Sequence, residues 1–579
     1  MRCHGRSQVA KMQSPCRGWG KSPTFGHGSI VPCQRTDCYL PQVLKQRTRL
    51  LDLGFYLLLG LSFVWLRRYE IRQLGLINPD EAELLAAGKR AAMSLIPYET
   101  FTTSTYGPLW PMVLGVIHKL GYPLTMPSGH LFAMLLSYAI CATVYLMLKK
   151  LTSQTAAASY TFGLALIWAS GGAPHDVDFV QMASELLPLV LLSVGVCVVA
   201  LRPHSVRSHL VALALIGSTP FAKFQFVPIS IIAAIFVGIG LNRVWRHRLS
   251  AVVMILVSYG SCGALLFMLT VLGGNFSKIF DEALPAVTNY VGSDAPNLIE
   301  RATRASEFFM KYPYFTALGL LGISLIAKQA QDAPIKVFAR SLTLPLLAML
   351  IGIMSTTSGP YIFPHYAYML LASSVLILAM ATYRTPRLTA CDEQPATTNS
   401  PTFGQRITLL AGVIFLVLGF SFALKKATGL EERTYETTWG QVLSADGGRQ
   451  AANSNTPSEI EPLCPPGSEV FVWGWAAEMF SYFDWTPSSR FVNNGSQLIP
   501  SSRQAQFKDA LSEELLTNRP VCIAEAIGPY FFRFTDFSLV LAEQVPSVAE
   551  MLSNEYEKKV VTYKSVIGDV PLVLYVRMS

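Results

Sequence analysis

The sequence predicts an α-helical polytopic membrane protein, about eleven transmembrane helices followed by a small extracytoplasmic α/β domain. Hydrophobic residues make up 51% of the 579 residues and charged residues only 14%, whereas soluble domains carry nearer a quarter. The hydrophobic residues fall in runs of roughly 17–25, the length that crosses a hydrocarbon core as a helix. Beyond residue 460 the pattern changes to short apolar runs that alternate with amphipathic segments.

Residues 1–48 precede the first hydrophobic run and are predicted to be a disordered cytoplasmic leader. The segment is rich in Gly, Ser, Pro and basic residues and has no hydrophobic core, so it does not resemble a cleavable signal peptide. Its four cysteines match no zinc-binding spacing and are expected to be free thiols. They are Cys3, Cys16, Cys33 and Cys38.

Hydrophobic runs within residues 49–425 predict the transmembrane domain. The expected spans are 51–69, 129–148, 156–172, 185–201, 209–221, 224–241, 250–272, 313–327, 341–356, 363–383 and 407–424. The division of 209–241 into two crossings rests on the Pro-broken bend Thr219–Lys223. A single long helix there would reverse the orientation of everything downstream.

Charge predicts the orientation of the chain in the inner (plasma) membrane. Basic loops such as Lys149-Lys150 and 243–248 alternate with acidic loops such as Asp80-Glu81 and Asp281-Glu282. With about eleven crossings every basic cluster falls on one side, as the positive-inside rule requires. The N-terminus is therefore expected in the cytoplasm and the C-terminal domain outside. Because Lys and Arg also concentrate in such short loops, as positive-inside topology requires, the formal net charge of +9 does not indicate nucleic-acid binding, and no nucleic-acid partner is expected.

After a polar linker, 426–460, the residues 461–579 are predicted to form the α/β domain. Val470–Trp473, Val521–Ala524 and Leu572–Val576 have the composition of short buried strands, and 502–517 and 546–554 have that of helices. Strands that alternate with helices favour an α/β arrangement. Cys464 and Cys522 lie in this domain, and the sequence leaves open whether they form a disulfide.

The tetrapeptide Asn78-Pro79-Asp80-Glu81 lies in the first outer loop, 70–128, at the start of a predicted helix. Asparagine is a good N-cap, proline suits the first helical position, and acidic residues are favourable in the first turn. A purely capping role is therefore one explanation. The helix Ala82–Met93 is too short to span, as is a second apolar stretch that ends near Leu120. Charge beside the bilayer is costly unless something uses it, which favours a functional role.

The order of these segments resembles the lipid-dependent glycosyltransferases of the GT-C superfamily. The closest likeness is to the branch of protein mannosyltransferases and aminoarabinose transferases for lipid A, which is similar to bacterial glycosyltransferase family 39. The motifs are short and run in order between residues 50 and 540. They are Pro79-Asp80-Glu81, Gly107-Pro108-Leu109, Asp178-Phe179 with Ser184-Glu185, Pro220–Gln225, Phe363–Tyr366, Val472–Trp475 and Ser489-Arg490-Phe491. Gly129-His130 replaces an Arg that this family often has at the start of the second span, which leaves one phosphate contact unassigned.

The resemblance implies a hexosyl- or pentosyltransferase that moves a sugar from a polyprenyl-phosphate carrier to a hydroxyl of the cell envelope, outside the membrane. A carboxylate within hydrogen-bond reach can take the proton of that hydroxyl. By family analogy Asp80 is the candidate general base, and Glu81 orients it or contacts the sugar. Glu185, and less strongly Asp178, would hold the acceptor or a divalent cation. The sugar and the metal are left open, and so is whether the acceptor is a lipid, a polysaccharide or a protein.

The lipid phosphate is the expected ligand of Lys223, a compact point charge on the Pro-broken bend. His365 and Tyr366 can donate to the same phosphate, and Tyr106 of the first outer loop is a further substrate-binding candidate. Each has a structural alternative, because Lys can snorkel and His and Tyr can anchor at the interface. Glu185 can equally be a capping residue.

A transporter or flippase of lipid-linked glycans is the alternative function. Secondary transporters have paired repeats and broken helices near mid-bilayer, whereas this chain has one obvious break, near Pro220, and its carboxylates cluster in outer loops. A non-catalytic scaffold is a third possibility, in which Asp80 and Glu81 only cap a helix. The sequence favours the enzyme.

Overall fold

The structure is a computed structural model of the whole chain. It describes residues 36–72, 78–102, 106–171, 179–245, 247–285, 296–357, 363–384, 403–430, 438–444, 459–529, 531, 534–565 and 568–578. The chain divides into two compact units, Met1–Gly54 and Phe55–Ser579. Everything that follows concerns the second unit, except that helix α1 (Thr36–Ile71) begins in the first.

Helices form most of the second unit. After α1 come α2 (Pro79–Ala91), α3 (Leu109–Lys119), α4 (Met126–Leu151), α5 (Gln154–Ala169), α6 (Leu186–Leu201), α7 (Val206–Ala222), η2 (Phe224–Phe226), α8 (Val227–Val244), α9 (Arg248–Leu272), α10 (Phe276–Lys278), η3 (Ile279–Ala283), α12 (Leu298–Lys311), α13 (Pro313–Gln329), α14 (Ile335–Thr357), η4 (Pro364–Ala367), α15 (Tyr368–Arg384), α16 (Phe403–Leu430) and α17 (Trp439–Val442). Each of the predicted spans overlaps one of the longer of these helices.

Length and composition qualify seven of the described helices as membrane spans, or eight if the pair α12 and α13, bent by 92°, counts as one. The chain is therefore a multi-pass membrane protein. The expectation of about eleven spans counts further helices that are short. Among them α6 and α7 are apolar but have only 16 and 17 residues, fewer than the roughly 20 that a perpendicular crossing needs.

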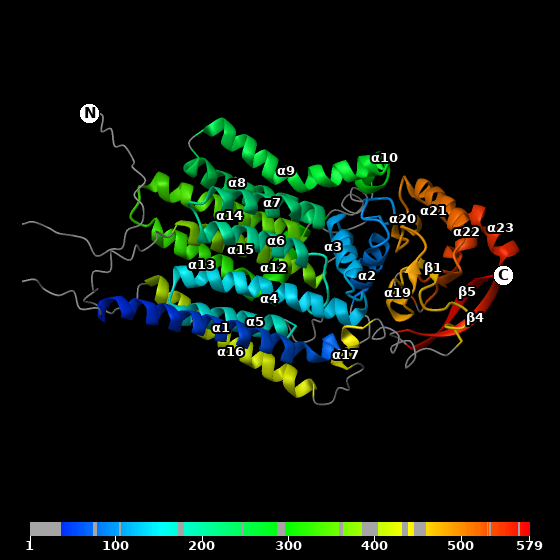
Figure 1. Cartoon of the computed structure of the whole chain (residues 1–579), viewed down its shortest axis with the longest axis horizontal. Helices are drawn as coiled ribbons and strands as arrows, with labels where there is room; N and C mark the ends of the chain where they lie inside the picture. Colours follow the sequence, from blue (N-terminus) through cyan, green and yellow to red (C-terminus); the bar gives the residue numbers. More distant parts are fainter. Residues whose placement is uncertain are drawn as a thin grey trace, which may run out of the picture. The chain divides into compact units, whose positions relative to one another are not determined.

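The centre of the bundle is α15, in which Tyr368–Thr382 are all buried. It packs against α4, α6, α13 and α14, so that it is apolar on every side rather than amphipathic. Figure 1 shows it surrounded by the other long helices.

The predicted break within 209–241 is present, although only the helix after it is long enough to qualify as a span. The chain leaves the helix at Lys223, whose backbone is extended, and α7 and α8 on its two sides pack against each other. Pro220 itself lies inside α7, one turn before the break. The missing N–H and the ring of proline weaken the last turn of a helix, which explains why the break follows it closely.

The first outer loop forms two short helices, α2 and α3, that pack on each other. Their contact depends on Gly88 and Gly115. A Cβ atom at Gly88 would lie 2.6 Å from the Leu114 side chain, and one at Gly115 would lie 2.8 Å from the Ala91 backbone. The two helices therefore approach more closely than larger residues would allow. Neither is long enough to span, as predicted.

The C-terminal domain is built on a five-stranded mixed sheet with the order β2-β1-β3-β5-β4. Its strands are β1 (Glu469–Gly474), β2 (Thr486–Pro487), β3 (Cys522–Ala526), β4 (Tyr556–Ser565) and β5 (Gly568–Arg577), and its helices are α19 (Glu478–Tyr482), α20 (Gly495–Leu498), α21 (Gln504–Asn518), η5 (Phe537–Leu539), α22 (Leu541–Gln544) and α23 (Pro546–Glu555). β1 pairs in parallel with β2 and β3, and β5 runs antiparallel to β3 and β4. The three predicted strands and both predicted helices are confirmed.

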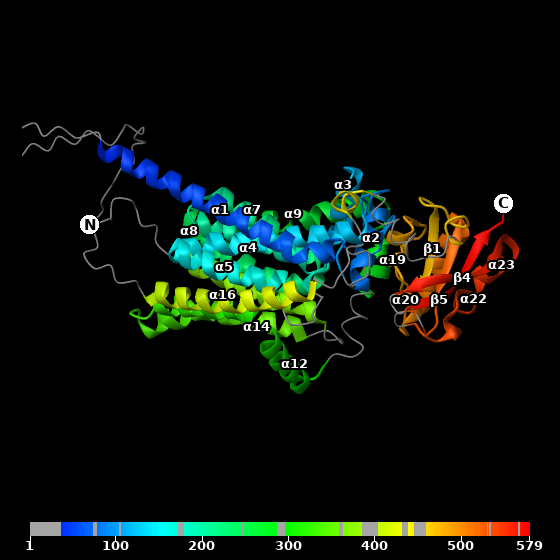
Figure 2. The same cartoon turned by 90° about the horizontal axis from the view of Figure 1, so that it is seen from below.

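Side chains alternate across the central strand β1. Phe471 and Trp473 pack with α21 and α23, while Val470 and Val472 belong to the larger core on the other face. That face lies toward α19, which packs against α2. Figure 2 shows the domain beside α2 and α3 at one end of the bundle. Cys464 and Cys522 form a disulfide, which settles the point that the sequence left open.

Candidate functional site

Asp80 lies in the first turn of α2, where the sequence predicted it. The Asn78 side chain caps the helix by accepting a hydrogen bond from the Asp80 backbone N–H at 2.9 Å. The Asp80 side chain is 29% exposed, whereas the next ten or so residues of the helix are buried. The positive end of the helix stabilises its ionised form. Asp80 thus combines a fixed position with access to small molecules.

One neighbour of Asp80 is His365, on the short helix η4. The His365 Nε2 atom lies 4.0 Å from Asp80 Oδ2, and its Nδ1 atom lies 3.5 Å from the Gln181 side-chain nitrogen. The imidazole stacks on the Phe363 ring with an interplanar angle of 9°. Tyr366 packs edge-on against the same imidazole and is 2% exposed. The predicted His-Tyr segment therefore reaches the predicted base.

Glu81 points away from Asp80 into the bundle and is fully buried. Its Oε1 atom accepts from the Met182 backbone N–H at 3.0 Å, and its Oε2 atom lies 3.0 Å from His130 Nε2. The His130 Nδ1 atom lies 2.7 Å from the Glu70 carbonyl oxygen, to which it must donate. Glu81 thereby ties α2 to α1, to α4 and to the segment before α6. His130, rated weakly from the sequence, is the residue that holds it.

Glu185 and Lys223 form a buried ion pair. The Lys223 Nζ atom lies 3.2 Å from Glu185 Oε1 and donates to Ser184 Oγ at 2.7 Å. The Trp110 indole N–H donates to the Ser184 carbonyl at 2.7 Å, which joins this cluster to α3. The two residues predicted for separate roles are partners of each other, with exposed fractions of 0% and 2%.

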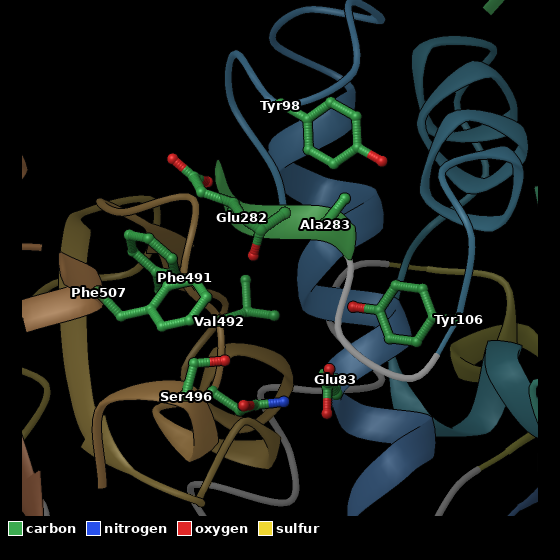
Figure 3. A pocket seen from close by; sticks show the side chains of 11 residues that line it. Glu83, Tyr98, Tyr106, Glu282, Ala283, Phe491, Val492, Ser496 and Phe507 are labelled. Atoms are coloured by element: carbon green, nitrogen blue, oxygen red, sulfur yellow. The ribbon is translucent and has the colours of Figure 1, made fainter. Parts of the chain in front are cut away.

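A pocket opens beside α2, one helical turn beyond Asp80. It has about 400 Å³ of open space, part of which is continuous with solvent. Figure 3 shows Glu83 and Tyr106 on one side facing Val492 and Ser496 of the C-terminal domain on the other. The complete lining comprises Glu83, Tyr98, Thr102, Tyr106, Glu282, Ala283, Phe491, Val492, Asn493, Ser496 and Phe507.

Tyr106, a predicted substrate-binding residue, connects the pocket to Asp80. Burial raises the pKa of its hydroxyl well above the usual value, and the charge of Glu83, its hydrogen bond to Glu83 and the charge of Asp80 raise it further. The hydroxyl therefore remains protonated and donates its hydrogen bond to Glu83. The adjacent Gly107 N–H donates to the Ala222 carbonyl at 3.0 Å, which places this loop against the Lys223 bend.

Basic side chains join the C-terminal domain to the loops around the pocket. The Lys89 Nζ atom, at the end of α2, donates to the Phe480 carbonyl at 2.8 Å, to Asp484 Oδ1 at 3.1 Å and to the Trp485 carbonyl at 3.3 Å. Arg490 pairs with Glu282 at 2.7 Å and also with Glu514. Arg490, which the sequence singled out only as part of the motif Ser489-Arg490-Phe491, therefore bridges two parts of the unit.

One predicted residue falls outside this account. Asp178 lies outside the residues that the structure describes. The predictions also missed Glu83 and Glu282, because an acidic residue in an outer loop carries no signal of the pocket that a distant segment completes. Among the described residues, no group of three or more His, Cys, Asp or Glu is arranged to hold a metal ion.

No protein family model matches the chain, and neither does any curated protein. Among solved structures, apo ArnT from Cupriavidus metallidurans is similar with a TM-score of 0.50 and 12% identity, over 92% of this chain and 98% of ArnT. The chain has an ArnT-like fold. ArnT bound to undecaprenyl phosphate matches with a TM-score of 0.48 and 15% identity, over 92% and 98% of the two chains. An Archaeoglobus fulgidus oligosaccharyltransferase tethered with an acceptor peptide matches with a TM-score of 0.44 and 11% identity, over 91% of this chain and 74% of the oligosaccharyltransferase.

The ArnT-like fold confirms the expected fold class, an α-helical polytopic membrane protein with a small C-terminal mixed-sheet domain. Such low identity to ArnT concerns the fold alone, because one fold can hold different active sites. The roles of individual residues must therefore be argued from the contacts described above.

Proposed function

We propose that the protein is a membrane glycosyltransferase that moves a sugar from a polyprenyl-phosphate carrier to a hydroxyl outside the membrane. The observation that carries the proposal is the position of Asp80. Its partly exposed carboxylate lies 4.0 Å from His365 and near enough to Tyr106 of the pocket for its charge to raise the pKa of that hydroxyl, in an ArnT-like fold. A carboxylate used only for capping would need neither neighbour.

The reaction assigns a task to each side of Asp80. The acceptor oxygen forms a bond to the anomeric carbon of the donor while the bond between that carbon and the phosphate oxygen breaks. The Asp80 carboxylate takes the proton of the acceptor hydroxyl, and the polyprenyl phosphate leaves with its electron pair. Because a helix N-terminus makes Asp80 a weak base, the rate must come largely from correct positioning.

The residues that bind the leaving phosphate in this proposal are Lys223, His365 and Tyr366. Lys223 is held with Glu185 in a buried pair, so a phosphate that approaches it would compete with that carboxylate. Glu185 therefore acts as the counter-ion of Lys223 in the resting protein. Glu81, locked by His130 and the Met182 backbone, positions α2 and with it Asp80. A divalent cation is not needed for any of these steps.

The disulfide supports the proposed orientation. Disulfides persist in oxidising compartments, so a C-terminal domain that carries Cys464–Cys522 belongs outside the cytoplasm of the cell. The pocket, which that domain completes, would then face the same side as the acceptor.

Mass spectrometry of envelope glycans and lipid-linked sugars tests the proposed function. Cells that lack the protein should accumulate one polyprenyl-phosphate sugar and lose one sugar from an envelope component. Complementation with the wild-type chain should restore both. Glycans that are identical with and without the protein would contradict the proposal, and a lipid-linked glycan confined to the inner leaflet would favour the flippase instead.

A further inference from the structure

We propose that the pocket between α2 and the C-terminal domain binds the acceptor, and that the acceptor presents a neutral sugar ring there. This inference rests on the proposed transferase function and adds the chemical class of its acceptor. The candidates that the sequence left open were a lipid, a polysaccharide or a protein. The pocket favours a carbohydrate group, carried by a polysaccharide or by a glycolipid.

The lining has the composition that a polyhydroxylated ring requires. Phe491 and Phe507 supply apolar faces, against which the C–H groups of a sugar can pack. Asn493 and Ser496 can both donate and accept hydrogen bonds, while Glu83 accepts strongly. Sugar hydroxyls are donors and acceptors at once, and pockets with apolar walls and a few placed polar groups fix the orientation of such ligands.

Both carboxylates that line the pocket already have partners. Glu282 is paired with Arg490 at 2.7 Å, and Glu83 accepts a hydrogen bond from Tyr106. Of the described residues that line the pocket, none is Lys or Arg. An acceptor that presents a phosphate or carboxylate here would face the carboxylates of Glu83 and Glu282, while the nearby Arg490 is already paired with Glu282 and Glu514. A cationic group would compete with Arg490 for Glu282. A neutral ring avoids both costs.

The position relative to Asp80 indicates the acceptor rather than the donor sugar. Asp80 has His365, from the membrane helices, on one side, and it influences Tyr106 of the pocket on the other. Lys223 and His365 contact the segment from Gln181 to Glu185, away from the C-terminal domain. A base between the phosphate-binding side and the pocket takes its proton from the group in the pocket, which is the acceptor.

The backbone at Tyr98, which lines the pocket, is held in a strained conformation before any ligand binds. Its backbone has φ of +64°, a left-handed conformation that is costly for a residue other than glycine. The Lys278 Nζ atom donates to its carbonyl at 3.1 Å and helps to hold it. Such strain is maintained where the surrounding structure needs a side chain in one place.

The test uses the full-length protein in detergent and saturation-transfer difference NMR with free methyl glycosides. The probes are neutral methyl glycosides of glucose, galactose, mannose and arabinose, with glucosamine and glucose 6-phosphate as charged comparators. Ser496→Phe fills the pocket, and Ser553→Phe makes the same change on an exposed face of α23 as a control. Glu83→Gln removes a charge with little change in size.

We expect at least one neutral glycoside to give a signal that falls at least fivefold in Ser496→Phe, falls in Glu83→Gln and persists in Ser553→Phe. Thermal unfolding of each variant identifies any that misfolds. Absence of signal from every neutral sugar, a stronger signal from a charged sugar, or an unchanged signal in both pocket variants would overturn the inference. Displacement of the glycoside by a polyprenyl-phosphate carrier of the same sugar would assign the pocket to the donor and overturn it as well.

Failure of the proposed function has a different signature. Binding does not require turnover, so the glycoside signal is measured independently of glycan transfer. If glycosides bind but the envelope glycans do not depend on the protein, the transferase is wrong and the sugar-binding pocket stands. If the glycans depend on the protein but the pocket variants bind sugars normally, the acceptor assignment is wrong.

Discussion

Neighbouring carboxylates in one helical turn have different surroundings here. Asp80 is partly exposed and lies beside His365, whereas Glu81 is fully buried and held by His130 and the Met182 backbone. Consecutive residues on a helix point about 100° apart, so one faces the site and the other faces the bundle. This geometry is the reason for proposing Asp80 as the base and Glu81 as the residue that positions α2.

His130→Phe should destabilise the protein by about 3–5 kcal/mol, because it leaves the buried Glu81 carboxylate without its partner. Thermal unfolding in detergent measures the loss. The double variant with Glu81→Gln should recover a substantial part of it, since the unpaired charge is gone. A double variant no more stable than His130→Phe would show that the pair is not coupled in this way.

Glu478 of the C-terminal domain should make stability depend on pH. Burial raises the pKa of its carboxyl to about 7, and one of its oxygens has no hydrogen-bond partner among the described residues. The folded state then keeps a proton that the unfolded state releases near pH 4.5. The free energy of unfolding therefore falls by about 3 kcal/mol as the pH rises from about 4.5 to 7. Above pH 7 this contribution no longer changes.

Glu478→Gln removes this titration, so the variant should gain stability relative to wild type at pH 8 but not at pH 4. Urea or thermal unfolding at both pH values measures the difference. A gain that is equal at the two pH values would mean that the carboxyl is not protonated in the folded protein.

At the scale of elements, α2 is the unit that the site depends on. Its first turn carries Asp80, its second lines the pocket through Glu83, and its last turn is anchored by Lys89 to the C-terminal domain. The close contact with α3 at Gly88 fixes one side. A short helix anchored at several points can hold a carboxylate precisely without spanning the membrane.

Lys89→Met should reduce stability by about 2 kcal/mol, since the Phe480 and Trp485 carbonyls lose a buried donor. Because α2 is no longer anchored, glycan transfer should fall through kcat more than through KM. Lys119→Met, at the exposed end of α3, is the matched control and should change neither property. Equal behaviour of the two variants would show that α2 does not need this anchor.

The elements that the sequence predicted well are those whose pattern is local. β1 and β3 are buried on both faces and have continuous apolar runs, and α21 and α23 have helical periodicity. β4 was missed because an edge strand that carries Glu557, Lys558 and Lys559 resembles a polar surface segment. β2 has only two residues and no pattern to detect.

The candidate site also has a part that a local sequence pattern predicts and a part that only the tertiary fold brings together. The first turn of α2 could be predicted because the cap, the proline and the carboxylates are adjacent in the sequence. The pocket could not, since Glu83, Glu282 and Phe491 are brought together only by the tertiary fold. The partnership of Glu185 with Lys223 was hidden for the same reason, although both residues were singled out.

At the scale of the whole molecule, the C-terminal domain is a component of the site rather than an appendage. It contributes Phe491 and Ser496 to the pocket and is joined to the membrane loops by Lys89 and Arg490. The Trp485 indole N–H donates to the Cys464 carbonyl at 2.9 Å, so the disulfide lies beside the segment that receives Lys89.

Loss of the disulfide should therefore weaken both the domain and the site. It closes a loop between residues 58 positions apart, and the double variant Cys464→Ser, Cys522→Ser should lose about 2–4 kcal/mol of stability. Thermal unfolding of wild type with a reductant should approach that of the variant, which the reductant should leave unchanged. A wild-type protein insensitive to a reductant that demonstrably cleaves the bond would contradict this prediction.

The central claim is that Asp80 removes the proton from the acceptor hydroxyl, and its substitution tests this most directly. Asp80→Asn keeps the size of the side chain and the backbone N–H that Asn78 caps, but its amide cannot accept that proton. Asp80→Glu retains a carboxylate base at an altered distance. In cells that lack the chromosomal copy, we expect Asp80→Asn to be inserted and folded like wild type yet to form at least about 100-fold less glycosylated product, with Asp80→Glu between the two. A folded Asp80→Asn protein that forms product within a few-fold of the wild-type rate would contradict the claim.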